Sequence, residues 1–152
     1  MIVFRIASRR HAVFDARGAS EYGGRWNSPA RPVIYASATL SLAMLEQLAH
    51  THTGRLPRSQ VFIEITIPNS VSMEIVVPKD VPAWDADDLI SSRAFGDRWL
   101  AEGRTCVLLT PSVIVPSEQN AVINPAHADF SEIVASAPRP VAWDRRLRRA
   151  RK

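Results

Sequence analysis

Prolines interrupt this chain so often that only short strands and helices fit between them. Eleven prolines are spread over 152 residues without forming a repeat or a linker, and each one fixes φ and removes a backbone donor. Short apolar runs lie between them, among them residues 2–6, 32–36 and 60–67. Many short strands with a few helices, and no regular strand–helix alternation, are typical of the α+β class with a mixed or antiparallel sheet.

The rest of the chain offers further short elements. Residues 7–31 are polar and predict a long loop, and residues 85–103 predict one or two short helices, with Gly96 and Asp97 opening the second. Further β-like runs occupy residues 71–77, 105–109, 112–115, 121–123, 131–136 and 140–143. We expect one catalytic domain over residues 1–144 and a separate tail over residues 145–152.

A helix is expected over residues 38–50, with Ser37 or Thr39 as its cap. Its leucines and alanines leave little polar surface, so it should be buried on most sides. Its own sheet or a second copy of the chain could cover it, and a homodimer within a larger complex is therefore one arrangement that the sequence allows.

The basic character of the chain belongs to its end. The net charge is +4, but residues 145–152 hold six of the 19 basic residues, so residues 1–144 carry 13 basic and 15 acidic side chains. No basic face with interleaved aromatic residues accompanies the tail, so direct binding of nucleic acid is not expected. A non-enzymatic binding module that uses this tail stays open as an alternative.

Several classes of protein are excluded by missing features. Cys106 is the single cysteine, which excludes a disulfide framework and a multi-cysteine metal site. The pair His50 and His52 has no further ligands nearby, so no metal is expected. No apolar run approaches the length of a membrane span, and we expect a cytoplasmic protein without a membrane partner.

Three residues stand out chemically. Arg25 follows two glycines, where a ligand can approach the backbone and a guanidinium can bind phosphate; the alternative is a surface turn with Arg25 in water. Tyr35 ends an apolar strand and offers a flat ring or a buried hydroxyl. Glu46 is the only charged residue between Arg31 and Arg55. A buried carboxylate must be paired, so Glu46 is either a functional group or a member of a narrow solvent-facing stripe.

These residues stand in blocks whose order resembles the RES domain family, the toxins of bacterial toxin–antitoxin pairs. Single blocks are weak, but the resemblance runs along nearly the whole chain. The blocks are Phe4-Arg5-Ile6, Gly23-Gly24-Arg25-Trp26-Asn27, Val33-Ile34-Tyr35-Ala36-Ser37, Ala43-Met44-Leu45-Glu46, Gly96-Asp97-Arg98-Trp99-Leu100, residues 111–116, 118–120 and 123–125, and Asp144-Arg145-Arg146-Leu147.

The resemblance implies a fold like that of ADP-ribosyltransferases and an enzyme that degrades NAD at the nicotinamide–ribose bond, by hydrolysis or phosphorolysis. Transfer of ADP-ribose to a protein is the alternative. NAD would be the consumed substrate, with no bound cofactor. The implied partner is an antitoxin with a helix-turn-helix-like DNA-binding part that blocks the active site.

Matching the family's polar positions gives each candidate residue an expected role. Glu46 would bond the ribose and stabilise its developing positive charge. Arg25 would hold the pyrophosphate or an adjacent ribose group, and Tyr35 would stack on nicotinamide and hold the leaving group in line. Ser112 could bond the nicotinamide amide, or be a strand-end hydroxyl satisfied by backbone. Arg5 and Asn120 are further candidates, for binding or for support of the site.

Overall fold

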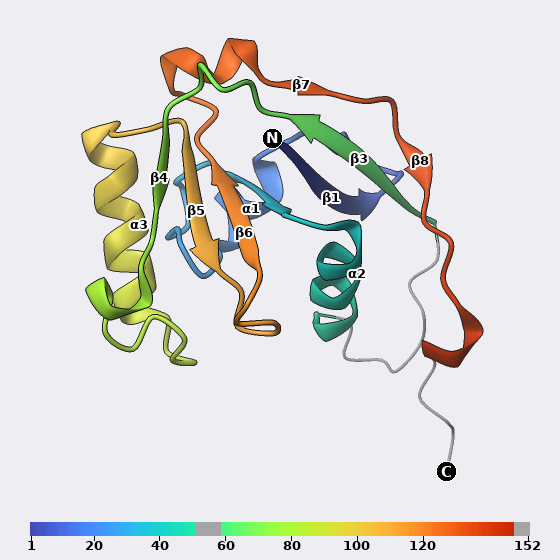
Figure 1. Ribbon diagram of the computed structural model, residues 1–152, viewed down its shortest axis with the longest axis horizontal. Coiled ribbons are helices and arrows are strands. Elements are labelled where there is room, and N and C mark those ends of the chain that lie inside the picture. Colours follow the sequence, from blue (N-terminus) through green and yellow to red (C-terminus); the bar gives the residue numbers. More distant parts are fainter. Residues whose placement is uncertain (51–58, 148–152) are drawn as a thin grey trace.

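A computed structural model describes residues 1–50 and 59–147 of the chain. Within them, eight strands form one sheet in the order β4-β5-β6-β2-β1-β3-β7, and β8 also pairs with β3 (Figure 1). Only β4 and β5 pair in parallel. The strands are β1 (Ile2–Ser8), β2 (Ile34–Ser37), β3 (Gln60–Thr66), β4 (Met73–Ile75), β5 (Val107–Pro111), β6 (Gln119–Ile123), β7 (Val134–Ala135) and β8 (Arg139–Pro140). The expected α+β class with a mixed sheet is confirmed.

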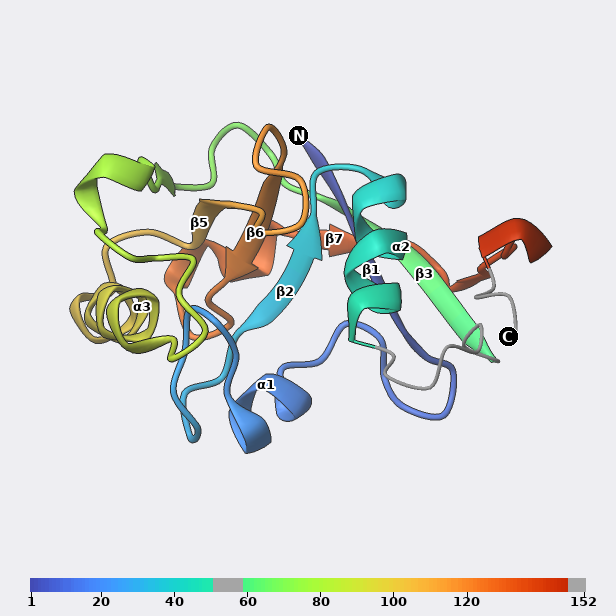
Figure 2. The same cartoon turned by 90° about the horizontal axis from the view of Figure 1, so that it is seen from below.

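Three α-helices and three short 3-10 helices accompany the sheet in the described ranges. Figure 1 shows α3 beside the β4–β5 end of the sheet and α2 on the other side of β6, and Figure 2 shows α2 crossing over β1. The helices are α1 (Arg17–Tyr22), α2 (Leu40–Ala49), α3 (Ile90–Glu102), η1 (Pro78–Asp80), η2 (Ala128–Glu132) and η3 (Arg145–Leu147).

The sheet opens between β1 and β2. These strands pair only at Phe4 and Ser37, whereas β1 pairs with β3 along its whole length and β2 does so with β6. Beyond that point the Arg5 guanidinium lies in the gap: it donates to the carbonyl oxygens of Tyr35 at 2.8 Å and Val13 at 2.7 Å. Burial of this guanidinium lowers its pKa. Backbone groups that the ladder leaves unpaired thus find a side-chain partner.

Two apolar clusters cover the two faces of the sheet. One cluster gathers alternate residues of the central strands, including Val3, Ile63 and Val107. The other packs α3 against the sheet through Trp99, Leu108 and Val122. Side chains that are partners across antiparallel strands share a face, so Tyr35 lies on the α3 face with Val122.

Helix α3 runs without a break through the predicted junction at Gly96 and Asp97, so the expectation of a second helix opening there is wrong. Gly96 instead permits close packing: a Cβ at this position would lie 1.9 Å from the carbonyl oxygen of Trp26. The ring of Trp26 also stacks on Trp84, with centroids 6.3 Å apart. The helix therefore fixes the loop that carries Arg25.

Helix α2 begins after Thr39, whose hydroxyl accepts a hydrogen bond from the Leu42 amide. The same hydroxyl donates to Glu118 at 2.8 Å, which ties the helix to the β5–β6 connection. Leu42 and Ala43 are its buried residues, while Leu45 is 41% exposed. The expectation of burial on most sides is therefore wrong for the outer face of this helix.

Two further expectations differ from the structure. The long loop predicted over residues 7–31 contains α1, and the β-like run at residues 112–115 is a loop. That loop is built around the Ser112 hydroxyl, which accepts hydrogen bonds from the amides of Ile114 and Val115 at 3.1 Å each. Local side-chain bonds of this kind compete with strand pairing.

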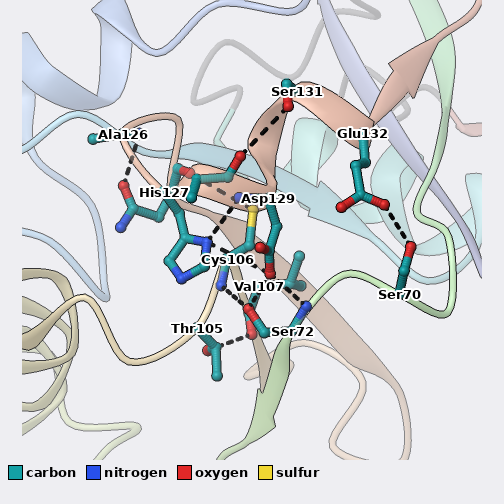
Figure 3. A network of polar contacts seen from close by, with 12 residues as sticks. Ser70, Ser72, Thr105, Cys106, Val107, Ala126, His127, Asp129, Ser131 and Glu132 are labelled. Carbon is teal, nitrogen blue, oxygen red and sulfur yellow. Dashed lines mark hydrogen bonds and ion pairs between the residues drawn. The ribbon is translucent and has the colours of Figure 1, made fainter.

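The chain after β6 is held to Ser72, just before β4, by a polar network that Figure 3 shows. Asp129 accepts hydrogen bonds from the Ser72 amide at 2.9 Å and the Ser72 hydroxyl at 2.5 Å. These bonds lower the pKa of the Asp129 carboxyl. His127 caps η2 by accepting from the Asp129 amide. The network fixes the segment that leads to β7.

Across residues 1–50 and 59–147, no helix is both long and apolar enough to cross a membrane. Of the predicted tail, residues 148–152 lie outside the described residues.

Candidate functional site

A pocket of about 180 Å³ lies where α2 crosses the open part of the sheet. Strands β1, β2 and β6 form its floor and the inner side of α2 forms its wall. Four of the candidate residues line it together, namely Arg5, Tyr35, Glu46 and Asn120. The other lining residues are Phe4, Ile6, Ala36, Ser37, Ala43, Gln47 and His50. Pockets for drug-sized ligands usually measure 300–1,000 Å³, so this one has room for only part of a dinucleotide.

Glu46 points from α2 toward the strands, and one of its oxygens is held there by two donors. The Asn120 amide nitrogen lies 2.7 Å from Oε1, and the Ser112 hydroxyl lies 3.0 Å from the same atom. No residue of the described part of the chain donates to Oε2. Glu46 is thus a carboxylate with one oxygen fixed by the protein and the other turned to no described partner, which favours the functional interpretation over the solvent stripe.

Ser112 lies behind Glu46 and is fully buried. Its hydroxyl donates to Glu46 and accepts from two backbone amides, which uses the one donor and both lone pairs of a hydroxyl. With these bonds in place it has no capacity for a nicotinamide amide. The structure therefore gives Ser112 the position of a support for Glu46, and direct contact with substrate would require one of these bonds to break.

Tyr35 also lines the pocket, while its hydroxyl is occupied. The hydroxyl accepts from the Trp26 amide at 2.9 Å and donates to Asn27 Oδ1 at 2.8 Å. Burial raises the pKa of this phenol above its usual value, so it stays protonated at neutral pH. Gly24 makes this position possible, because a Cβ there would lie 2.5 Å from the hydroxyl oxygen.

Arg25 does not line the pocket. Its Nη1 donates to the carbonyl oxygens of Trp84 at 3.1 Å and Ala86 at 2.9 Å. Arg93 of α3 lies nearby, since its Nε donates to the Gly24 carbonyl at 2.9 Å. Both guanidinium charges act on the Tyr35 hydroxyl, Arg93 more strongly, and both lower its pKa against the larger effect of burial. Asp97 acts on the same hydroxyl in the opposite direction, more strongly than Arg25. Neither guanidinium makes an ion pair with a described carboxylate, and the two together form a cationic region near Tyr35.

Ser37 and Arg93 were not among the site residues that the sequence suggested. The Ser37 hydroxyl donates to Asn120 Oδ1 at 2.7 Å, and the residue is 5% exposed. Ser37 follows Tyr35 at the spacing of two that places strand residues on one face. That spacing could have drawn attention to Ser37, whereas nothing local in the sequence links Arg93 to Gly24.

Other reactive side chains lie away from the pocket. Burial raises the pKa of the Cys106 thiol to about 11, and the thiol is a core group as the sequence indicated. In the described part of the chain, no three His, Cys, Asp or Glu side chains gather as a metal site would require.

Comparison with known proteins gives consistent matches. The model of a family described as RES domain matches residues 2–144. A Sphingobium protein named Prs ADP-ribosylating toxin is 41% identical over 134 residues, which cover 86% of this chain and 83% of the relative. A Yersinia enterocolitica protein named Toxin Res is 35% identical over 153 residues, covering 97% of this chain and all of the relative.

A solved structure shares the fold. It is described as the crystal structure of the M. tuberculosis MbcT–MbcA toxin–antitoxin complex, and the matched chain superposes with a TM-score of 0.74 at 18% identity. The match covers 90% of this chain and 81% of the other. At this identity the similarity establishes the fold alone.

Proposed function

The chain belongs to the RES domain family, and on that premise we propose that it is a toxin that destroys NAD by cleaving the bond between nicotinamide and ribose. The observation that carries the proposal is Glu46, a carboxylate with one oxygen fixed by Asn120 and Ser112 inside a pocket that Tyr35 also lines. The curated relatives named as toxins support the biological role.

Cleavage of the nicotinamide–ribose bond is favoured by a fixed negative charge near the ribose. Cleavage of the glycosidic bond places positive charge on the ribose carbon and ring oxygen, as in glycoside hydrolysis. A carboxylate already oriented in a partly dry pocket stabilises that charge without reorganising. Glu46 Oε2 accepts hydrogen bonds from the ribose hydroxyls, while Oε1 remains on its two protein donors. The electron pair of the breaking bond leaves with nicotinamide, and water, phosphate or a protein side chain bonds to the ribose carbon and releases its proton to solvent.

The size of the pocket determines which part of NAD enters it. At about 180 Å³ the pocket is smaller than usual sites for drug-sized ligands, so only the nicotinamide–ribose half is placed in it, with nicotinamide against Tyr35. The pyrophosphate then extends past Tyr35 toward the cationic region of Arg25 and Arg93. A guanidinium there keeps its charge at any physiological pH and can bind two phosphate oxygens at once.

The direct test is identification of the products. Purified protein is incubated with NAD, with and without inorganic phosphate, and the products are separated by mass spectrometry. Release of nicotinamide with ADP-ribose indicates hydrolysis, and release with a phosphorylated ADP-ribose indicates phosphorolysis. NAD that stays intact under both conditions would refute the proposal.

A second candidate, ADP-ribosylation of a protein, is favoured by one observation, the relative named Prs ADP-ribosylating toxin. It uses the same bond cleavage and differs only in the acceptor. Adding cell lysate to the incubation with NAD distinguishes it, because the ADP-ribose would then be found on a protein. If so, nicotinamide release should depend on the lysate.

We also propose an antitoxin partner with a helix-turn-helix-like DNA-binding part, in keeping with the toxin–antitoxin complex that shares the fold. A partner that closes the pocket should suppress nicotinamide release when co-expressed. The non-enzymatic alternative has its own test: removing residues 145–152 should abolish salt-sensitive association with nucleic acid if the tail is the functional part, and should leave NAD cleavage intact if the pocket is.

A further inference from the structure

Ser37 and Asn120 connect to Glu46 through two hydrogen bonds in sequence. The Ser37 hydroxyl donates to Asn120 Oδ1 at 2.7 Å, and Asn120 Nδ2 donates to Glu46 Oε1 at 2.7 Å. The three side chains come from β2, β6 and α2. Ser37 and Asn120 are register partners in the β2–β6 ladder, so the backbone pairing itself brings the hydroxyl to the amide.

The direction of these two hydrogen bonds matters because an asparagine amide has two different ends. One end is an oxygen that accepts, the other a nitrogen that donates. Rotating the amide by half a turn would place its oxygen against the Glu46 carboxylate, where two acceptors repel. A hydroxyl can donate only one proton, and in this structure Ser37 donates it to the amide oxygen. Because a hydroxyl can also accept, it is the carboxylate, which only accepts, that requires the nitrogen to face Glu46, and the Ser37 bond to Oδ1 holds the amide in that position.

We propose that Ser37 is a positioning residue that orients Glu46 through Asn120. With the amide fixed, Oε1 keeps its two protein donors and Oε2 is presented to the substrate. Ser37 itself need not touch the reacting atoms. The role in catalysis rests on the proposed NAD cleavage, whereas the dependence of the Asn120 amide on Ser37 does not.

A double-mutant cycle separates this role from general support of the fold. The variants are Ser37→Ala, Ser37→Thr, Asn120→Ala and Ser37→Ala with Asn120→Ala. Ser41→Ala is the matched control, since Ser41 is an exposed serine of α2 away from the pocket. We expect Ser37→Ala to lower kcat for nicotinamide release by up to about 100-fold, the loss that a misplacement of about 1 Å can cause, with a much smaller change in KM.

Two comparisons make the cycle decisive. Ser37→Thr, which keeps the hydroxyl, should retain most of the rate. In the Asn120→Ala background, Ser37→Ala should have no further effect, because residues that act through one another are not additive. An unchanged kcat in Ser37→Ala, or the same loss in both backgrounds, would overturn the proposal.

A second measurement does not depend on any reaction. In nitrogen-15 NMR spectra, the side-chain NH2 signal of Asn120, assigned by its absence in Asn120→Ala, should show one proton shifted by its bond to Glu46. That shift should disappear in Ser37→Ala and persist in Ser37→Thr. If Ser37→Ala leaves the signal unchanged, the positioning role is wrong. If the signal behaves as expected but wild-type protein leaves NAD intact, the proposed function fails and the positioning of Glu46 stands.

Discussion

At the scale of single residues, the guanidinium of Arg25 is held by main-chain oxygens rather than by a carboxylate. The carbonyl groups of Trp84 and Ala86 fix its Nη1, and no described acidic side chain neutralises its charge. Such a group is oriented and still attractive to an anion. The sequence suggested Arg25 from the two glycines before it, but the contacts with residues 84 and 86 join segments about sixty positions apart and could not be predicted.

Arg25→Lys should therefore weaken NAD binding more than it slows cleavage. Lysine keeps the charge but loses the planar fork, and one charge-assisted hydrogen bond is worth about 1.5–3 kcal/mol. We expect KM for NAD to rise about tenfold or more, with kcat changed less. Steady-state measurement of nicotinamide release gives both constants. Arg98→Lys, an exposed change on α3, is the control, and an unchanged KM in Arg25→Lys would remove Arg25 from the binding site.

At the scale of elements, the local patterns predicted most strands but not how the elements pack. The alternation in residues 60–67 matches β3, and the cap at Thr39 starts α2 as expected. The run at 112–115 failed as a strand because the Ser112 hydroxyl takes the amides that a ladder would use. A glycine suggested a break between helices at position 96. Its actual reason is close packing against the Trp26 backbone, which is seventy residues away and leaves no local signal in the sequence.

Gly96→Ala tests that packing. The added methyl would meet the Trp26 carbonyl, so α3 must move away from the loop that carries Arg25. Overpacking of this kind costs about 1–3 kcal/mol, even though alanine is the better helix former. Urea denaturation should therefore give a lower free energy of unfolding for Gly96→Ala than for wild type.

Gly18→Ala in α1 provides the matched control for this change. Nothing lies within 4 Å of a Cβ at Gly18, so that variant should be as stable as wild type or slightly more stable. Equal stability of Gly96→Ala and Gly18→Ala would contradict the packing described for α3.

At the scale of the whole molecule, the opening between β1 and β2 places the candidate site. The sequence predicted the α+β class. Four of the blocks that resemble the RES domain family supply Arg5, Tyr35, Glu46 and Asn120 to one pocket. The opening itself was not predictable, since it depends on β1 pairing fully with β3 and only once with β2. At the same scale, the network around Asp129 ties the segment after β6 to Ser72, just before β4 (Figure 3).

That network predicts how stability depends on pH. Because its bonds to Ser72 lower the pKa of Asp129 in the folded state, the carboxylate stabilises the fold above its unfolded pKa. The contribution is lost as the pH falls through the lower folded value. At pH 7, Asp129→Asn should thus unfold at a lower urea concentration than wild type. The difference between the two midpoints should narrow as the pH approaches 3.

The exposed Asp85 serves as the comparison, since no described residue hydrogen-bonds its side chain. Asp85→Asn should unfold close to wild type at both pH values. A difference between Asp129→Asn and wild type that stays constant from pH 7 to pH 3 would show that the charge of Asp129 does not stabilise the fold.

The central claim is that the negative charge of Glu46 drives cleavage of NAD, and Glu46→Gln tests it most directly. The variant keeps the shape of the side chain and removes its charge, with Glu21→Gln on the exposed surface of α1 as the control. The measurement is nicotinamide release by each folded protein at saturating NAD. We predict a loss of about a hundredfold or more in kcat for Glu46→Gln, in the range found when a group that stabilises a transition-state charge is removed, and none for Glu21→Gln. Release by Glu46→Gln at the wild-type rate would contradict the account.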